Sequence, residues 1–270
     1  MTHIFDGKDF ALQKEEKLKT EVLLLKSKGF YPHLASIIIG DEPASSLYAG
    51  LKKKAGKRIG VEVNIYDMPE KSKKEDVDLL IKSFNEDKNI TGIMIQFPIP
   101  GTLSKYKNEF IELIDSNKDV DGLKNESKFV HPTSKAALEI LNFAKSPPEL
   151  KDRKISTVCV IGSTGMVGKS LVKELKAKNY DVFECDENTK DLSKKTITAD
   201  VVISATGVPG LIKPSMVKDG VVIIDIGSPL GDVNKNVAEK SSFFTPVPGG
   251  VGPVTIVSLM ENLIFEKKNL

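Results

Sequence analysis

The feature that most constrains the fold is a strand–turn–helix pattern at residues 155–178. Residues 158–161 are apolar and mostly β-branched, which is typical of a buried strand, and glycines follow at Gly162, Gly165 and Gly168. Glycine lets the backbone turn sharply and approach a ligand closely. One face of the helix expected next carries four apolar residues: Val167, Leu171, Val172 and Leu175.

This glycine turn has two interpretations. A helix N-terminus offers free N–H groups and a positive dipole end, which suit a pyrophosphate. The spacing is G-x-x-G-x-x-G, because Ser163 replaces a glycine of the usual dinucleotide-binding G-x-G-x-x-G. We predict nucleotide binding, with an ordinary strand–helix turn as the alternative. The expected contacts are Gly162, Ser163, Thr164, Val167 and Gly168.

Charge and cysteine content argue against several classes of protein. A formal net charge of +2 does not suit bulk binding of nucleic acid or of a membrane surface. The two cysteines, Cys159 and Cys185, fit a reducing cytosol without a disulfide framework. With no signal-peptide pattern and no apolar run near about 18 residues, we predict a cytoplasmic protein without a membrane partner. The three histidines form no ligand-spaced cluster, so we expect no metal site.

The first half of the chain reads as a β-α-β-α-β unit with right-handed crossovers. The expected strands are 34–39, 61–66 and 91–96, and the expected helices are 8–28, 44–59, 73–87 and 104–116. The continuous apolar run at 34–39 is typical of a parallel sheet covered on both faces. The residues expected to face inward are Leu18, Val22 and Leu25 in the first helix, and Leu47, Leu51 and Ala55 in the second.

The second half is a further α/β unit. We expect helices at 134–145 and 255–267, and strands at 156–161, 180–184, 200–205 and 221–226. Two of these strands end next to a glycine, and open parallel sheets bind ligands at such carboxyl ends. The candidate contacts there are Thr206, Gly207 and Ser228. The predicted fold class is α/β, with two α/β domains, the second Rossmann-like, and a cleft between them.

Four further segments carry a family resemblance: Tyr48-Ala-Gly-Leu-Lys52, Gln96-Phe-Pro-Ile-Pro100, Asp119-Val-Asp121-Gly122 and Pro246-Val-Pro-Gly-Gly-Val-Gly-Pro253. With the glycine turn, they resemble the bifunctional methylenetetrahydrofolate dehydrogenase/methenyltetrahydrofolate cyclohydrolase family over essentially the whole chain. There are three departures. The family's Pro-Cys-Thr-Pro segment reads His131-Pro132-Thr133-Ser134 here, its proline after the turn is Ser170, and Thr164 replaces the usual serine.

The resemblance implies both the architecture and the activity. It implies a folate-binding catalytic domain at 1–122 plus 255–270, a NAD(P)-binding Rossmann-like domain at 123–254, and a homodimer. The implied reaction oxidises 5,10-methylenetetrahydrofolate with NADP and then hydrolyses the methenyl product to 10-formyltetrahydrofolate, in one-carbon metabolism. Tetrahydrofolate derivatives are therefore the expected ligands.

Four residues of the first domain are expected to carry the chemistry. Tyr48 and Lys52 are four apart and share one helix face; the resemblance implies that Lys52 is the essential catalytic group and that Tyr48 packs on the folate. Desolvation could lower the pKa of Lys52 from about 10.4 toward operating pH, so that its neutral amine activates water. Gln96 can hydrogen-bond the folate or Lys52. Asp121 offers a carboxylate to the pterin, as its family counterpart does.

Each assignment has a structural alternative. Lys52 could be a solvated lysine of the run 52–54, Tyr48 a helix-flank aromatic, and Gln96 merely the end of a strand. Asp121 could be an ordinary turn carboxylate. The glycines and prolines of the 246–253 string could form a linker, a rigid wall beside the folate, or both. The residues expected to line the folate there are Pro248, Gly249 and Gly250.

Cofactor choice depends on the loop after the second strand of the dinucleotide domain. An acidic residue about 20 positions beyond the glycine turn usually binds the ribose 2′-hydroxyl of NAD, and Asp186 lies at about that distance. Its carboxylate, or that of Glu187, would repel a 2′-phosphate, whereas Ser163, Thr189 and Lys190 could hold one. The alternative is that both acids are exposed charges without a contact. NADP is the family default, and we expect NAD to be usable.

Two other functions fit parts of the pattern. One is a two-domain dehydrogenase acting on a small acid, but the chain's arginines are only Arg58 and Arg153, so a substrate-clamping arginine is not evident. The other is a non-catalytic nucleotide-sensing module. The joint presence of Lys52, Gln96 and Asp121 favours the enzyme over both.

Overall fold

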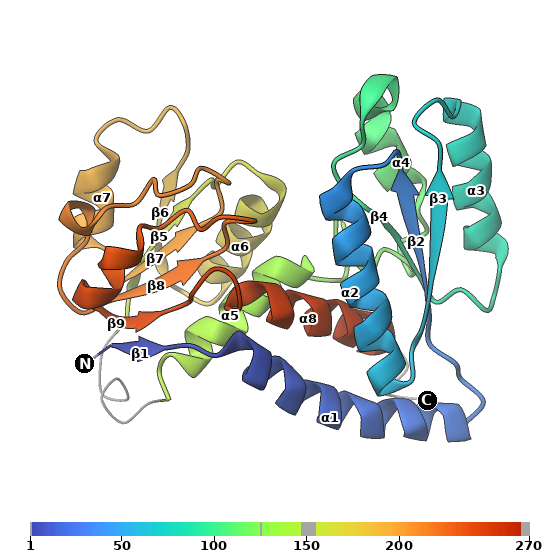
Figure 1. The fold of residues 1–270 in the computed structure, drawn as a ribbon, viewed down its shortest axis with the longest axis horizontal. Helices are drawn as coiled ribbons and strands as arrows, with labels where there is room; N and C mark the ends of the chain where they lie inside the picture. Colours follow the sequence, from blue (N-terminus) through green and yellow to red (C-terminus); the bar gives the residue numbers. More distant parts are fainter. Residues whose placement is uncertain (1, 125, 147–154, 266–270) are drawn as a thin grey trace. The chain divides into compact units, whose positions relative to one another are not determined.

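The computed structural model describes residues 2–124, 126–146 and 155–265. The chain forms two compact units (Figure 1). The first unit comprises Met1–Ala11 and Thr133–Thr255, and the second comprises Leu12–Pro132 and Ile256–Leu270. Each unit contains its own parallel sheet, which confirms the predicted α/β class with two domains. The cleft expected between them stays a prediction.

The second unit is built on three parallel strands in the order β3-β2-β4. The central strand, β2 (His33–Ile39), is the continuous apolar run, and its last six residues are all buried. It is flanked by β3 (Glu62–Met68) and β4 (Gly92–Ile95). Helix α3 (Lys74–Glu86) covers this sheet, and its Ile81 joins Ile37 of β2 in one hydrophobic core.

Helix α1 (Gly7–Ser27) buries Leu18, Val22 and Leu25, as predicted. The stripe predicted for α2 (Pro43–Ile59) is wrong in two of its three residues, because Leu47 is 63% and Leu51 38% exposed, and only Ala55 is buried. The buried residues of α2 are Ser45, Ala49, Lys52, Ala55, Gly56 and Ile59.

Close packing explains the choice of small residues on this face of α2. A Cβ atom on Gly56 would lie 2.6 Å from a methyl carbon of Val63 in β3. At Gly56 the helix therefore lies so near the strand that even a methyl side chain would not fit. The consequence for function is that Lys52 lies on the buried face of the helix.

The helix expected at 104–116 is wrong in type and length. The chain forms a 3₁₀ helix, η1 (Gly101–Tyr106), and then α4 (Lys107–Leu113). Ile114 has extended backbone angles, and its N–H donates to the carbonyl of Ile111. The Lys124 ammonium then donates to the carbonyls of Glu112 and Ile114 at 2.8 and 2.6 Å. This side chain satisfies the carbonyls at the helix end, so the helix stops there.

The first unit has six parallel strands in the order β1-β9-β8-β7-β5-β6. The central strands are β5 (Thr157–Ile161), β7 (Val201–Ser204) and β8 (Val221–Asp225), with β6 (Asp181–Cys185) at one edge. All four were expected from the sequence within one or two residues at each end. Residues of β7 and β8 are buried throughout, as a parallel sheet covered on both faces requires.

The N-terminal residues differ from expectation. Strand β1 (His3–Ile4) pairs with β9 (Ser241–Phe244), and Phe5 packs against Phe143 and Phe243 with ring centroids 5.4 and 5.6 Å apart. These contacts place Met1–Ala11 with the six-stranded unit, whereas the sequence analysis assigned them to the folate domain. Similarly, the unit boundary falls at residues 132 and 133 rather than after 122.

The remaining helices of this unit are α5 (Pro132–Phe143), α6 (Met166–Ala177), α7 (Leu192–Thr198) and the 3₁₀ helices η2 (Pro214–Met216) and η3 (Lys235–Lys240). The last helix, α8 (Val251–Phe265), begins four residues before the expected 255, since Pro253 is tolerated in a first helical turn. Its expected end at 267 lies outside the described residues.

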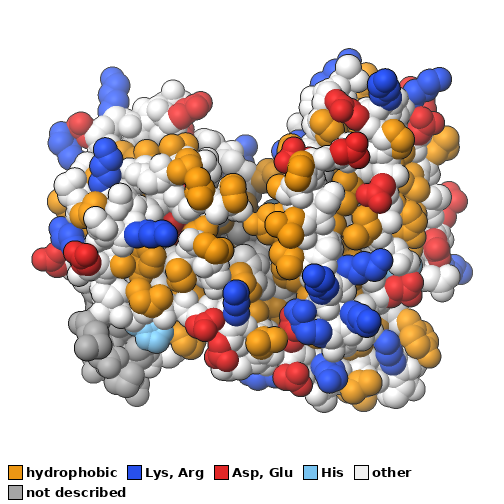
Figure 2. All heavy atoms as spheres, in the orientation of Figure 1, with side chains coloured by type: hydrophobic (Ala, Val, Ile, Leu, Met, Phe, Trp, Pro, Cys, Tyr) orange, Lys and Arg blue, Asp and Glu red, His pale blue; other side chains and the backbone are white. Residues whose placement is uncertain are grey.

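The surface of the chain carries both signs of charge. On the face seen in Figure 2, acidic and basic side chains are interspersed, in line with a formal net charge of +2. No helix of the described ranges combines the length and the apolar character that crossing a membrane requires.

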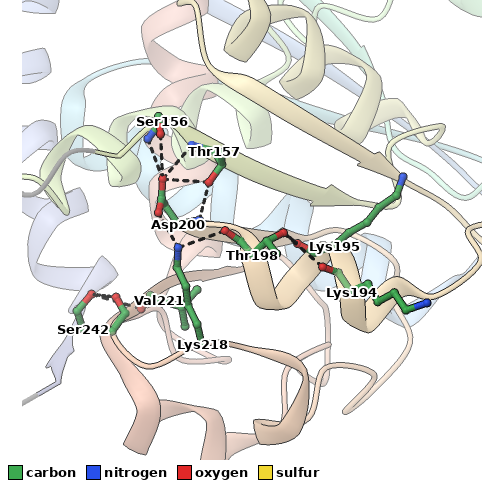
Figure 3. A network of polar contacts seen from close by, with 10 residues as sticks. Ser156, Thr157, Lys194, Lys195, Thr198, Asp200, Lys218, Val221 and Ser242 are labelled. Carbon is green, nitrogen blue, oxygen red and sulfur yellow. Dashed lines mark hydrogen bonds and ion pairs between the residues drawn. The ribbon is translucent and has the colours of Figure 1, made fainter.

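Asp200 organises the amino-terminal edge of the six-stranded sheet (Figure 3). Its Oδ2 accepts from the backbone N–H groups of Ser156 and Thr157 at 2.9 and 3.0 Å, and its Oδ1 accepts from Lys218 at 2.7 Å. Burial would raise the pKa of Asp200. The bonds from Lys218, Thr157 and Ser156 outweigh burial and hold that pKa well below its usual range.

Replacing Asp200 with asparagine should lower the free energy of unfolding by about 1–3 kcal/mol at pH 7, because these donors lose a charged acceptor. A carboxylate with a depressed folded pKa stabilises fully above its unfolded pKa of about 3.9 and loses this effect as pH falls through the folded value. The difference between wild type and variant should therefore shrink in acid. Denaturant titrations at pH 7 and below pH 4 measure it.

Asp181→Asn is the matched control, because Asp181 is an exposed carboxylate at the start of β6, the edge strand that pairs with β5. It should change neither the stability nor its pH dependence. Equal unfolding free energies of Asp200→Asn and wild type at pH 7 would contradict the assigned role.

Candidate active site

Lys52 and Gln96 meet at the carboxyl end of the three-stranded sheet. Lys52 is buried on α2, with 7% of its surface exposed, and its Nζ donates to Gln96 Oε1 at 2.7 Å. Gln96 directly follows β4 and stays in register, because its N–H donates to the carbonyl of Ile37 at 2.8 Å. Lys53 and Lys54 are exposed, so the solvated-lysine alternative applies to them and not to Lys52.

Burial changes the acidity of Lys52. Desolvation lowers the pKa of its ammonium to about 8, although the negative charge of Asp121 acts in the opposite direction. With that pKa, about one Lys52 side chain in ten is neutral at pH 7. The site therefore contains an amine that can act as a base near neutral pH, as the sequence analysis suggested.

The turn that carries Asp121 is attached to the edge of the same sheet. Asp119 forms a parallel bridge with Ile93 of β4, and its buried carboxylate accepts from the N–H groups of Leu123 and Lys124 at 3.2 and 3.1 Å. Burial raises the pKa of Asp119. The buried Asp119 thus shapes the turn, while Asp121 remains half-buried at its tip.

Tyr48 is half-buried and lies one turn before Lys52 on α2.

The three predicted substrate contacts of the proline–glycine segment belong to the other unit. Pro248 is exposed, Gly249 is half-buried and Gly250 is buried. Gly7 N–H donates to the Gly249 carbonyl at 3.0 Å, and a Cβ atom on Gly7 would lie 1.8 Å from the Gly250 carbonyl oxygen. Close backbone packing against this segment thus requires glycine at position 7.

The glycine turn follows β5 and leads into α6. Gly162 has φ +83°, and a Cβ atom on Gly168 would lie 2.0 Å from the Gly162 carbonyl oxygen, so both positions require glycine. Ser163 is buried, whereas Thr164 is exposed. Helix α6 has 12 residues and no acidic side chain in its first turn. Its positive end is therefore suited to a phosphate group.

The other predicted cofactor residues follow neighbouring strands of the same sheet. Asp186 follows β6, Thr206 and Gly207 follow β7, and Ser228 follows β8. Because these strands are parallel, their carboxyl ends share one edge with the glycine turn.

Two buried carboxylates, which the sequence analysis missed, shape these loops. Asp232 Oδ2 accepts from the Ser204 hydroxyl at 2.8 Å and from the Thr206 N–H at 2.7 Å. Asp225 accepts from the N–H groups of Gly227, Asp232 and Val233 at 2.9–3.0 Å, and burial raises its pKa. The sequence signal for Asp225 was its position as an acidic residue at the end of an apolar strand. The local sequence around Asp232 carried no such signal.

Two departures from the family pattern also have defined positions. Ser134, where the family has proline, is buried, and its hydroxyl donates to the Val167 carbonyl at 2.9 Å. His131 is buried in the unit that contains Lys52. Its place in the altered segment was the only sequence signal for it. Among the described residues, no three His, Cys, Asp or Glu side chains converge in a way that could hold a metal ion.

Comparison with known proteins covers both units. Residues 5–121 match the catalytic domain of the tetrahydrofolate dehydrogenase/cyclohydrolase family, and residues 132–269 match its NAD(P)-binding domain. The chain belongs to this family. The resemblance stated from the sequence is therefore confirmed.

Individual relatives cover almost the full chain. The bifunctional protein FolD of Lactobacillus acidophilus is 39% identical over 98% of this chain and 96% of its own. The crystal structure of the bifunctional FolD methylenetetrahydrofolate dehydrogenase/cyclohydrolase of Campylobacter jejuni has a TM-score of 0.90 at 34% identity, covering 100% and 99% of the two chains.

A third relative carries a dinucleotide. The Trypanosoma brucei N5,N10-methylenetetrahydrofolate dehydrogenase-cyclohydrolase, solved with NADP cofactor and an inhibitor, has a TM-score of 0.89 at 28% identity, with 98% of each chain covered. The predicted nicotinamide dinucleotide cofactor is thus confirmed for this family member.

Replacing Gly168 with alanine should destabilise the first unit and weaken NADP⁺ binding, because the new Cβ would push the Gly162 carbonyl out of place. Overpacking of this kind costs about 1–3 kcal/mol. Thermal unfolding and calorimetric titration with NADP⁺ measure the two effects. Gly252→Ala in α8, where a Cβ meets no atom within 4 Å, is the control. Unchanged stability and affinity in Gly168→Ala would refute the packing argument.

Proposed function

We propose that this chain oxidises 5,10-methylenetetrahydrofolate to 5,10-methenyltetrahydrofolate with a nicotinamide dinucleotide and hydrolyses that product to 10-formyltetrahydrofolate, with Lys52 as the central catalytic residue. The observation that carries the assignment of Lys52 is its environment. Its amine is buried, donates to Gln96 and has a pKa lowered to about 8. Such a group is a base at neutral pH, whereas an exposed lysine is not.

The charge requirements of the two steps fit a neutral amine. When bound, NAD(P)⁺ accepts the hydride that leaves the methylene carbon, and the folate becomes a cation. A second positive charge beside this cation would oppose its formation, so neutral Lys52 suits the oxidation. In the hydrolysis, the same amine takes a proton from the water that attacks the methenyl carbon.

The other proposed roles follow from where the side chains lie. Gln96 orients the Lys52 amine through the 2.7 Å bond and can also hydrogen-bond the folate. Asp121 accepts from the donor edge of the pterin, and Tyr48 packs on the folate from the same helix as Lys52. Pro248, Gly249 and Gly250 form a wall for the substrate.

The domain roles and the assembly complete the proposal. The folate chemistry belongs to the unit that contains Lys52, and dinucleotide binding belongs to the unit that contains the glycine turn. On the strength of the family resemblance, we propose a homodimer. The reducing environment inferred from two unpaired cysteines supports a cytoplasmic location.

Lys52→Met should leave a folded protein without cyclohydrolase activity and with severely reduced dehydrogenase activity, because the base is removed. The wild-type cyclohydrolase rate should rise with pH through an inflection at about 8, where Lys52 loses its proton. Spectrophotometric assays of methenyltetrahydrofolate formation and decay measure both. Lys53→Met, at the exposed neighbouring lysine, is the control and should resemble wild type. A Lys52→Met variant that keeps most of its cyclohydrolase activity would reject this base.

Cofactor preference is the second test. Asp186 Oδ1 accepts from the Asn188 N–H and the Thr189 hydroxyl at 2.9 and 3.2 Å, which holds the acidic loop beside the strand end. We propose that its negative charge weakens discrimination in favour of NADP⁺, so that NAD⁺ is also used. Asp186→Ser should shift kcat/KM toward NADP⁺.

The measurement is kcat/KM for NAD⁺ and NADP⁺ at saturating folate. Asp219→Ser is the control, because it removes an exposed carboxylate before β8, at the opposite end of that strand from the cofactor loops. A wild-type preference for NADP⁺ above about 100-fold, or about 2.7 kcal/mol, would show that the acidic loop does not face the ribose.

A further inference from the structure

A buried amide ties His131 to the turn that carries Asp121. The side chain of Asn262 on α8 donates to the carbonyl oxygens of Val120 and Val130, both at 2.9 Å. Val120 immediately precedes Asp121, and Val130 immediately precedes His131. The Asn262 side chain therefore holds the backbone immediately before Asp121 and immediately before His131.

Close backbone packing is a second, independent tether. Gly122 has φ +63°, and a Cβ atom there would lie 2.5 Å from the Phe129 carbonyl oxygen and 2.9 Å from the His131 backbone nitrogen. Glycine is needed both for this backbone conformation and for the close approach. The turn and the segment leading to His131 are thus in direct contact, next to Asp121.

Charged groups from two elements act electrostatically on His131. Asp121 and Asp119 come from the turn, and Lys52 comes from α2. Burial has the largest influence and lowers the pKa of His131, Asp121 raises it, and Lys52 lowers it further. The imidazole is therefore neutral at neutral pH. In acid it gains a positive charge that attracts the Asp121 carboxylate and repels Lys52.

We propose that His131 is a positioning residue for Asp121: the neutral imidazole leaves that carboxylate available to the folate, and the imidazolium pairs with it and withdraws it. The inference rests on the pterin-binding role proposed above for Asp121. Folate binding should then weaken in acid as His131 gains a proton. This histidine occupies a position where the family pattern has proline.

The charge coupling can be measured directly, because the chain has only three histidines, His3, His33 and His131. Proton NMR titration of the imidazole signals, assigned by loss of one signal in His131→Gln, follows each histidine. The pKa of His131 should fall in Asp121→Asn and rise in Lys52→Met, since each variant removes one of the charges that act on it. A His131 pKa that is unchanged in both variants would overturn the placement.

Folate binding gives the functional readout. The Kd of tetrahydrofolate, measured by calorimetry from pH 8 downward into acid, should rise as His131 takes up its proton, by at most about tenfold per pH unit because a single proton is involved. In His131→Gln this contribution should be lost. Protonation of the ligand itself affects all variants equally, so the comparison isolates the protein group.

His33→Gln is the matched control, because His33 lies at the amino end of β2, in the same unit but at the opposite end of that strand from Gln96. It should bind tetrahydrofolate with the wild-type pH profile. An identical acidic rise in His131→Gln and wild type would overturn the inference. Failure of the wild type to form methenyltetrahydrofolate would instead reject the proposed function, and the binding profiles would still decide the role of His131.

Discussion

Burying an amine is the constraint on which the second unit depends. A lysine with 7% exposure loses most of its hydration, which is costly unless the amine is hydrogen-bonded or loses its proton. Here the partner is the uncharged Gln96, at 2.7 Å. A carboxylate in that position would hold the proton on Lys52, whereas an amide satisfies the amine in either protonation state. On α2, Lys52 lies on the same buried face as Ala49, Ala55 and Gly56.

In the first unit, buried carboxylates have a comparable organising role with a different outcome. Asp225 and Asp232 each gather several donors from the loops after β7 and β8, so the backbone there is held by side chains rather than by a ladder. A Cβ atom on Gly227 would lie 2.4 Å from Asp232 Oδ1, which explains the glycine at that strand end. Rigid loops at the carboxyl edge are what a dinucleotide site needs, because binding then orders little additional chain.

The sequence was sufficient where a pattern was long and local. The apolar runs of β2, β5, β7 and β8 and the glycine turn predicted the α/β fold. It was insufficient where distant segments decide the outcome. The inward face of α2 depends on how closely β3 approaches, so hydrophobicity selected Leu47 and Leu51, which are exposed. Strand β1 has only two residues and exists because β9 lies beside it. His131 gained its place near Asp121 through Asn262, which no local pattern reveals.

The two hydrogen bonds that Asn262 donates also have a consequence for the order of events during synthesis. This residue follows Val120 by 142 positions and Val130 by 132. At about 5–20 residues per second, a ribosome needs roughly 7–28 s to reach it after the Asp121 turn has been made. During that interval the nascent chain already contains Lys52, Gln96 and Asp121 but lacks the amide that fixes the turn. The proposed folate site is therefore completed only after Asn262 of α8 has been translated, although all of its proposed catalytic residues lie in the first half of the chain.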